Sequence, residues 1–310
     1  MADYSNHVGT EEGPATDHTA ARDDAATRRV LVVTGGHRVD LDAFLVAIEE
    51  ICAVRGWVWA HATQPAAQRW LVPEHAGRWD AVLLHDIPGL HLKRGEEPRT
   101  VGPQPEVAEA VVKLLDLGQG LVVLHHALSA WPGWEGWAEA IGGRFQYLPG
   151  PLRDRWAPAS GYRMARHTVE VVAPGHPVCA GVQPFELDDE LYHAEVLADR
   201  VTPLLRTRAD LDGAGFLDAH DVVRHGSSTG VTCAGRPPAS DLVGWTTTAG
   251  RSPVVYLQPG DGAPTFGHPA FRRLLGNALA WVSSPAAHAA AAAAPVPVRL
   301  PAGHRVLGGT

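Results

Sequence analysis

The stretch Gly120-Leu121-Val122-Val123-Leu124-His125-His126-Ala127 decides the fold class of this chain. An apolar run rich in β-branched residues ends in two histidines, a pattern typical of a buried strand that carries polar groups at its carboxyl end. Residues 30–37 and 81–86 follow the same pattern, and helices are expected between such strands. Strand–helix alternation of this kind predicts an α/β fold with parallel strands and right-handed crossovers.

The two ends of the 310-residue chain differ in composition from the middle. Residues 1–27 are polar and charged, and residues 284–310 are rich in alanine and proline. Both are therefore expected to be disordered tails. Residues 28–283 are enough for one large α/β domain with a well-buried core.

Charge and cysteine usage exclude several classes of protein. The formal net charge is −8 and no basic block occurs, which argues against nucleic acid as a partner. No apolar run approaches about 18 residues, so neither a membrane span nor a secretory signal is expected. Cys52, Cys179 and Cys233 are far apart in the sequence and are expected to be reduced thiols in a cytoplasmic protein.

The histidine pair is the first candidate for chemistry. Side chains alternate along a strand, so His125 and His126 are expected to point apart unless the chain has already turned. One of them would face a crevice as a general acid or base, or as a metal ligand, while the other packs beneath it. A pair of structural histidines is the alternative.

The two earlier strand ends carry further candidates. Gly35 and Gly36 allow close approach of a ligand to backbone N–H groups, and His37 follows as a substrate contact, although a plain tight turn fits the same residues. Asp86 could bind substrate or orient His85. Alternatively, Asp86 caps the adjacent loop.

An acidic segment at residues 186–193 and a tryptophan complete the candidates. In an extended chain Glu190 and Tyr192 share one face, and His193 lies on the other. With the histidines, these side chains would form a polar cup for a polyhydroxylated ligand; an acidic surface turn is the alternative. Trp131 precedes an expected helix and could line the same site, since tryptophan offers a flat apolar face to a sugar ring.

Several segments in this order resemble the ThuA-like family, named for trehalose utilisation. They are spread over residues 29–283 and comprise residues 33–37, 120–127, 176–181, 189–192, 253–260 and 268–271. The resemblance implies a flavodoxin-like, doubly wound, mostly parallel sheet with helices on both faces. It also implies a relation to class I glutamine amidotransferases, with a histidine where those enzymes carry cysteine.

The resemblance also implies a role in sugar metabolism, with a small-molecule carbohydrate as ligand and a sugar dehydrogenase as a partner. His37, His125, Glu190 and Tyr192 match positions of the family motifs. Asp261 departs from the pattern, because family members often carry histidine after the preceding Pro-Gly pair. This departure indicates altered chemistry or a different ligand if that position belongs to the site.

Together these observations predict a carbohydrate enzyme that isomerises or cleaves a sugar or keto-glycoside, with His125 as base and Glu190 as its acid partner or as a residue that orients the ligand. If one divalent metal ion is bound, His125, Glu190 and His193 are the expected ligands, with His85 and Asp86 next. The alternative is a non-catalytic sugar- or metabolite-binding protein on an amidotransferase-like scaffold. Catalysis by a serine or thiol nucleophile is disfavoured, because no Gly-x-Ser-x-Gly or Gly-x-Cys-x-Gly elbow follows the 121–124 strand.

Overall fold

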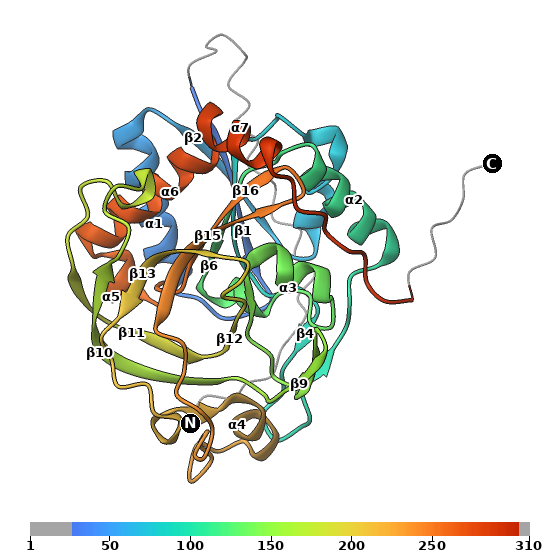
Figure 1. Cartoon of the computed structure of the whole chain (residues 1–310), viewed down its shortest axis with the longest axis vertical. Helices are drawn as coiled ribbons and strands as arrows, with labels where there is room; N and C mark the ends of the chain where they lie inside the picture. Colours follow the sequence, from blue (N-terminus) through green and yellow to red (C-terminus); the bar gives the residue numbers. More distant parts are fainter. Residues whose placement is uncertain (1–26, 304–310) are drawn as a thin grey trace.

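The computed structural model describes residues 27–303, and its centre is a mixed β-sheet whose parallel half carries the polar strand ends (Figure 1). In spatial order this half consists of β2 (Val58–Thr63), β1 (Arg29–Gly35), β3 (Ala81–Asp86), β6 (Leu121–Leu124) and β16 (Ser252–Leu257). Counted along the chain, the order of these parallel strands is 2-1-3-4-5, the flavodoxin-like arrangement. The carboxyl ends of β1, β3 and β6 therefore lie at one edge of the sheet.

The other half of the sheet is antiparallel and curls across those strand ends. It continues from β16 through β15 (Leu242–Ala249), β13 (Thr202–Thr207) and β10 (Gly161–Val171) to the edge strand β11 (Phe185–His193). The short strand β14 (Leu217–Asp218) also pairs with β10. Figure 1 shows β10 and β11 sweeping around one side of the molecule. This curvature lets the edge strand β11 contact the residue that follows β6, although four strands separate β11 from β6 in the sheet.

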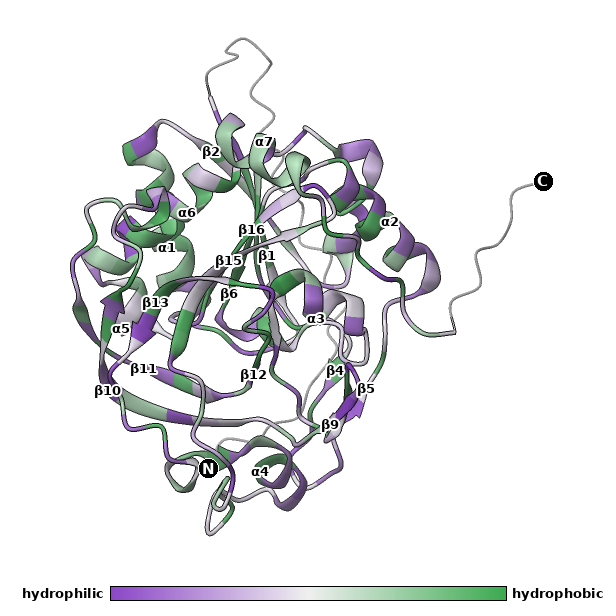
Figure 2. Ribbon diagram, in the orientation of Figure 1, coloured by the Kyte–Doolittle hydropathy of each residue, from purple (hydrophilic) through white to green (hydrophobic). Residues whose placement is uncertain are grey.

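Helices cover both faces of the parallel half. One face carries α1 (Leu41–Arg55) and α6 (Pro269–Val282), and the other carries α2 (Pro105–Asp116) and α3 (Glu135–Ile141). Val30 and Val32 of β1 pack into the first core, while Leu31 and Val33 pack into the second, as the period of two requires. Figure 2 shows hydrophobic residues concentrated in these central strands. The predicted fold class is confirmed.

Short elements fill the connections. The strands are β4 (Leu90–His91), β5 (Arg99–Thr100), β7 (Gly143–Arg144), β8 (Gly150–Leu152), β9 (Arg155–Ala157) and β12 (Glu195–Val196). The remaining helices include α4 (Ala219–His225), α5 (Ala263–Phe266) and the 3₁₀ turns η1 (Ala66–Trp70), η2 (Pro73–His75), η3 (His125–Ser129), η4 (Pro177–Cys179) and η5 (Gly213–Gly215).

The C-terminal segment differs from the expectation of a disordered tail. Within the described part of residues 284–310, α7 (Pro285–Ala293) forms a helix that buries Ala287 and Ala291. Ser284 caps it by accepting a hydrogen bond from the backbone N–H of Ala287. Alanine is the best helix former, so a low-complexity run that can pack on a neighbour becomes helical. Of the expected N-terminal tail, residues 1–26 lie outside the described residues.

The chain beyond α7 also packs on the domain. Val296 bridges to Gly250 in an antiparallel pair, and the indole N–H of Trp134 donates to the carbonyl of Arg299 at 2.6 Å. No helix among residues 27–303 combines the length and apolar character needed to cross a membrane.

Candidate active site

His125 is placed by the abrupt end of β6. The 3₁₀ turn η3 begins at His125 itself, whose φ of 47° lies in the left-handed region that a residue with a Cβ rarely adopts. The Tyr256 hydroxyl donates to the His125 carbonyl at 3.4 Å, and His125 Nδ1 lies 2.5 Å from the carbonyl oxygen of Gln258. A carbonyl can only accept, so Nδ1 carries a proton and Nε2 faces the site. Strained backbone of this kind is concentrated at functional sites.

Three oxygen-bearing side chains converge on Nε2 of His125. The Tyr192 hydroxyl lies at 2.9 Å, a Glu190 carboxylate oxygen at 3.4 Å and an Asp261 carboxylate oxygen at 3.6 Å. Tyr192 and Glu190 come from the edge strand β11, and Asp261 comes from the loop after β16. His125 is fully buried, whereas the Glu190 and Asp261 side chains keep 15% and 34% of their surface exposed. A ligand can therefore reach the carboxylates from solvent.

The carboxylates determine the charge of His125. Burial alone would lower the pKa of His125, but hydrogen bonds to Asp261 and Glu190 and the charge of Asp189 raise it to about 10. Conversely, the hydrogen bond from His125 lowers the pKa of Asp261. Burial raises the pKa of Tyr192, so its hydroxyl stays protonated. At neutral pH the centre is an imidazolium surrounded by carboxylate and phenol oxygens.

The other histidines of the strand ends form a neutral row beside His125. His126 Nδ1 lies 3.5 Å from His85 Nε2, and the exposed His37 stacks on the His126 ring with centroids 4.0 Å apart. Burial, followed by repulsion from His125 and His37, lowers the pKa of His85 to about 3 and the pKa of His126 well below its usual value. Both imidazoles of the pair at 125–126 face one cluster, because the turn at His125 ends the alternation of the strand.

Asp189 anchors the loop that carries Asp261, and sequence reasoning did not select it as a site residue. Its side chain is 1% exposed and accepts hydrogen bonds from the backbone N–H groups of Gly260 at 2.8 Å, Asp261 at 3.1 Å and Glu190 at 2.9 Å. Gly260 has φ of 147°, and a Cβ there would lie 3.2 Å from the His125 Cβ. The sequence did contain a signal for Asp189, because an acidic residue at an inward-facing position of a β-strand needs buried hydrogen-bond donors.

The glycine turn after β1 shapes the site through its packing. The Gly35 carbonyl accepts a hydrogen bond from the backbone N–H of Ile87 at 2.8 Å, and a Cβ on Gly36 would lie 2.2 Å from the Ile87 carbonyl oxygen. Glycine at position 36 is thus required by the close approach of the chain that leaves β3. The turn delivers His37 onto His126.

The residues that could hold a metal ion differ from the expected set. His125, His126, Glu190 and Asp261 each offer a ligand atom, and these atoms lie within 4.8 Å of one another. Two imidazoles and two carboxylates suit zinc or a similar divalent ion, and the His125–Gln258 contact is the outer hydrogen bond that metal-binding histidines make. The structure does not bring His193 into this group. Its Nε2 donates instead to the carbonyl of Pro237 at 2.8 Å, because His193 lies on the other side of β11 from Tyr192.

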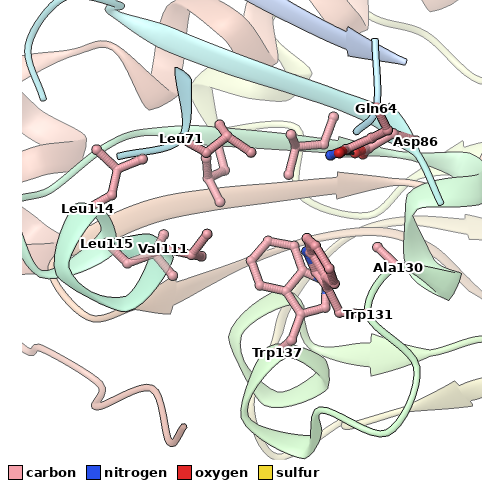
Figure 3. A pocket seen from close by; sticks show the side chains of 11 residues that line it. Gln64, Leu71, Asp86, Val111, Leu114, Leu115, Ala130, Trp131 and Trp137 are labelled. Atoms are coloured by element: carbon pink, nitrogen blue, oxygen red, sulfur yellow. Dashed lines mark hydrogen bonds between the residues drawn. The ribbon is translucent and has the colours of Figure 1, made fainter. Parts of the chain in front are cut away.

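Asp86 and Trp131, expected as substrate contacts, lie in a separate place (Figure 3). They line a small, mainly apolar cavity of about 20 Å³ together with Gln64 and Trp137, which is room for about one water molecule. Gln64 donates to one oxygen of Asp86 at 2.7 Å, and the other oxygen is buried without a partner in the described residues. Burial raises the pKa of Asp86 to about 7 despite the Gln64 hydrogen bond. The structure therefore does not bring Asp86 and Trp131 into the His125 cluster.

The thiols do not take part in this site. Cys52, Cys179 and Cys233 are free and buried, and burial raises their pKa values to about 12, 11 and 11. A thiol of raised pKa is a poor nucleophile at neutral pH.

Fold and site together define a class: a flavodoxin-like α/β protein with a histidine–carboxylate centre at the carboxyl ends of its parallel strands. The chain belongs to the ThuA family, described as trehalose utilisation, whose model matches residues 29–282. Membership of this family points to a carbohydrate-related role.

Two solved structures share the fold. A ThuA-like protein from Bacteroides uniformis is 16% identical, with a TM-score of 0.58 over 85% of this chain and 94% of the other. A ThuA-like protein from Parabacteroides merdae is also 16% identical, with a TM-score of 0.58 over 83% of this chain and 90% of the other. No curated protein matches the chain.

Proposed function

We propose that this protein is an enzyme that catalyses proton transfer on a keto-sugar or keto-glycoside, leading to isomerisation or cleavage. The observation that carries the proposal is the convergence of Glu190, Asp261 and Tyr192 on Nε2 of the buried His125. A ketone makes the proton on the neighbouring carbon acidic. Removal of this proton needs a base, together with a hydrogen-bond donor for the developing enolate oxygen.

In the proposed reaction the protonated His125 is the acid. The Glu190 carboxylate removes the proton from the carbon beside the ketone, and the His125 imidazolium donates its Nε2 proton to the carbonyl oxygen. In the return step Glu190 donates its proton to a carbon of the enediol while the neutral His125 takes a proton back from an enediol oxygen, so protons and charge balance over the cycle. These roles reverse the assignment expected from the sequence, because the carboxylates around His125 favour its charged form. His37 and the Tyr192 hydroxyl would hold substrate hydroxyl groups.

A divalent ion held by His125, His126, Glu190 and Asp261 would replace the Nε2 proton of His125, and it would supply Lewis-acid stabilisation of the same oxygen in place of that proton. The metal content of protein purified without chelator, measured by elemental mass spectrometry, tests this version of the site. About one equivalent that disappears in Asp261→Asn supports it. A metal-free protein with full activity assigns the chemistry to His125 and Glu190 alone.

Exchange of the proton beside the ketone tests the activity itself. The protein is incubated in D₂O with a panel of 3-keto-sugars and 3-keto-glycosides, and loss of the C–H signal is followed by NMR. We expect exchange, or product, with the wild type and a loss of about 10²- to 10⁴-fold in His125→Gln and Glu190→Gln. Glu186→Gln, at an exposed position near the other end of β11, is the matched control and should retain the wild-type rate.

Full activity in His125→Gln would contradict the proposal. Tight binding of a keto-sugar with neither exchange nor turnover would instead support the second reading, a non-catalytic sugar-binding protein. The sugar dehydrogenase implied by the family resemblance can be added to this assay, because such an enzyme would supply the keto-sugar from the parent sugar.

A further inference from the structure

A second cavity lies apart from the His125 cluster. It has a volume of about 460 Å³ and is lined mainly by residues 144–151, which begin at the end of β7, with further residues from the segments 132–136 and 299–302. This volume lies within the range of small-molecule sites. Phe145 separates it from the active site, since its ring packs edge-on against Tyr192, with centroids 4.7 Å apart, and Tyr192 in turn stacks on His125.

Arg144 in the wall of this cavity makes no ion pair in the described part of the chain, and the nearby charge of Glu135 offsets its burial only in part. Its residue is 6% exposed, its Nη2 is buried with no hydrogen bond, and no ion pair of its guanidinium occurs within residues 27–303. Its backbone is fixed, because β7 pairs with β12 opposite Glu195. Burying a charge without a partner is costly, so such a group in a cavity wall indicates that a ligand completes it.

The neighbouring arginines show how unusual this is. Arg153 pairs with Asp199 at 2.8 Å, and Arg155 pairs with Glu195. Arg299 pairs with Glu135 at 2.6 Å and with Glu139 at 2.8 Å. The acid of the cavity wall whose charge acts on Arg144, Glu135, is already engaged by other groups. One of its oxygens accepts from Arg299 and the other from the backbone N–H of Arg153.

We propose that this cavity binds a small organic molecule that carries a carboxylate or phosphate group, and that the oxyanion pairs with Arg144. A guanidinium presents paired N–H donors that match both anions. The cavity is much larger than the anion alone, and the aromatic side chain of Tyr147 also lines it. The rest of the ligand therefore has room for a ring of the size of a sugar. This site is independent of the proposed reaction at His125.

Calorimetry and thermal unfolding of the full chain test the proposal, with glucose 6-phosphate and gluconate as the two anionic probes and glucose as the neutral control. We expect at least one anionic probe to bind and raise Tm, with an effect that weakens at high salt, and glucose to do neither. Comparison of the two probes distinguishes a phosphate from a carboxylate ligand.

Three variants test whether anion binding changes in the direction that the proposal requires. Arg144→Gln should weaken binding of the anionic probe at least tenfold without lowering the Tm of the free protein, because it removes a buried charge that is offset only in part. Glu135→Gln should strengthen binding severalfold, because it removes a negative charge from the wall. Arg155→Gln, which loses an arginine of an exposed ion pair nearby, should bind like the wild type.

Unchanged binding in Arg144→Gln would overturn the proposal, as would failure of both anionic probes to bind the wild type. A large fall in the Tm of ligand-free Arg144→Gln would show that the guanidinium is structural. If that variant does not fold, Glu135→Gln decides, since weaker or unchanged binding there contradicts an anion site. Retained anion binding in His125→Gln would show that this cavity acts separately from the active site.

Discussion

His125 and Asp86 are buried titratable groups at neighbouring strand ends, but the surroundings of His125 favour its charged form, whereas those of Asp86 favour its neutral form. Both side chains are almost completely buried. Around His125 two carboxylates and a phenol meet its free nitrogen, and its pKa rises to about 10. Around Asp86 the walls are mainly apolar and Gln64 is the one hydrogen-bond partner among the described side chains, so burial raises its pKa to about 7.

The comparison teaches that burial alone shifts a carboxyl or an imidazole toward its neutral form, and that the charged form of such a group is kept where opposite charges converge on it. His85, next to Asp86 in β3, makes the same point. It faces the other side of the sheet, against Phe44 and His126, and burial with neighbouring imidazoles lowers its pKa to about 3. We therefore assign chemistry to the charged centre around His125 and a structural role to Asp86.

The largest expected effect concerns Asp189, the anchor of the charged centre. Asp189→Ala leaves the backbone N–H groups of Gly260, Asp261 and Glu190 without their acceptor, so the free energy of unfolding should fall by about 3 kcal/mol or more. Urea denaturation measures this. Asp188→Ala, at the exposed position next to Asp189, is the matched control and should change stability by less than about 0.5 kcal/mol. Equal effects of the two variants would show that the anchor is unimportant.

Substitution of Asp86 should stabilise the protein, whereas substitution of Asp189 destabilises it, because burial disfavours the charged form of Asp86. Its folded-state pKa of about 7 lies above the usual 3.8, so the folded protein holds an extra proton between these values and stability falls as pH rises through that window. Asp86→Asn should therefore stabilise the protein above pH 7, by on the order of 2–4 kcal/mol, with little gain below pH 4. Thermal unfolding at several pH values measures this. A gain that does not depend on pH would contradict the buried, protonated carboxyl.

Removing one carboxylate tests whether the surrounding charges raise the pKa of His125. Asp261→Asn keeps the size of the side chain but removes one charge from the centre, so the pKa of His125 should fall from about 10 by about one pH unit. NMR titration of the imidazole measures this. Asp241→Asn, at the partly exposed ion pair with Arg206, is a control that should leave the titration of His125 in place.

The smallest effect is expected at the single hydrogen bond of Asp86. Gln64→Met removes the donor to Asp86 Oδ2, which should move the pKa of Asp86 further upward and lower the stability at pH 8 by about 1 kcal/mol. Thermal unfolding at pH 5 and pH 8 measures this. In the Asp86→Asn background the pH dependence of the Gln64→Met effect should vanish, and its persistence there would point to another titrating group.

The local elements could be read from the sequence because their signals are local. Asp40 caps α1 and Gly56 ends it in the left-handed conformation, as expected from an N-cap acid and a terminal glycine. The apolar runs that form β1, β3 and β6 likewise predicted where histidines gather, because each run leads to histidine at the carboxyl end of its strand. Helix α7 was not predicted, because the Ala/Pro-rich composition of residues 284–310 is also typical of a tail, although Ser284 and Pro285 form a standard helix start.

What the sequence by itself determined is thus the α/β class, the parallel strands and the row of imidazoles at their ends. Only the tertiary structure decided which carboxylates meet His125. Asp261 and Glu190 arrive from the loop after β16 and from an edge strand, and the pleat of β3 turns Asp86 away from His85. Periodicity follows from the geometry of each backbone segment, whereas these contacts follow from strand order and sheet curvature, which depend on the packing of the whole chain.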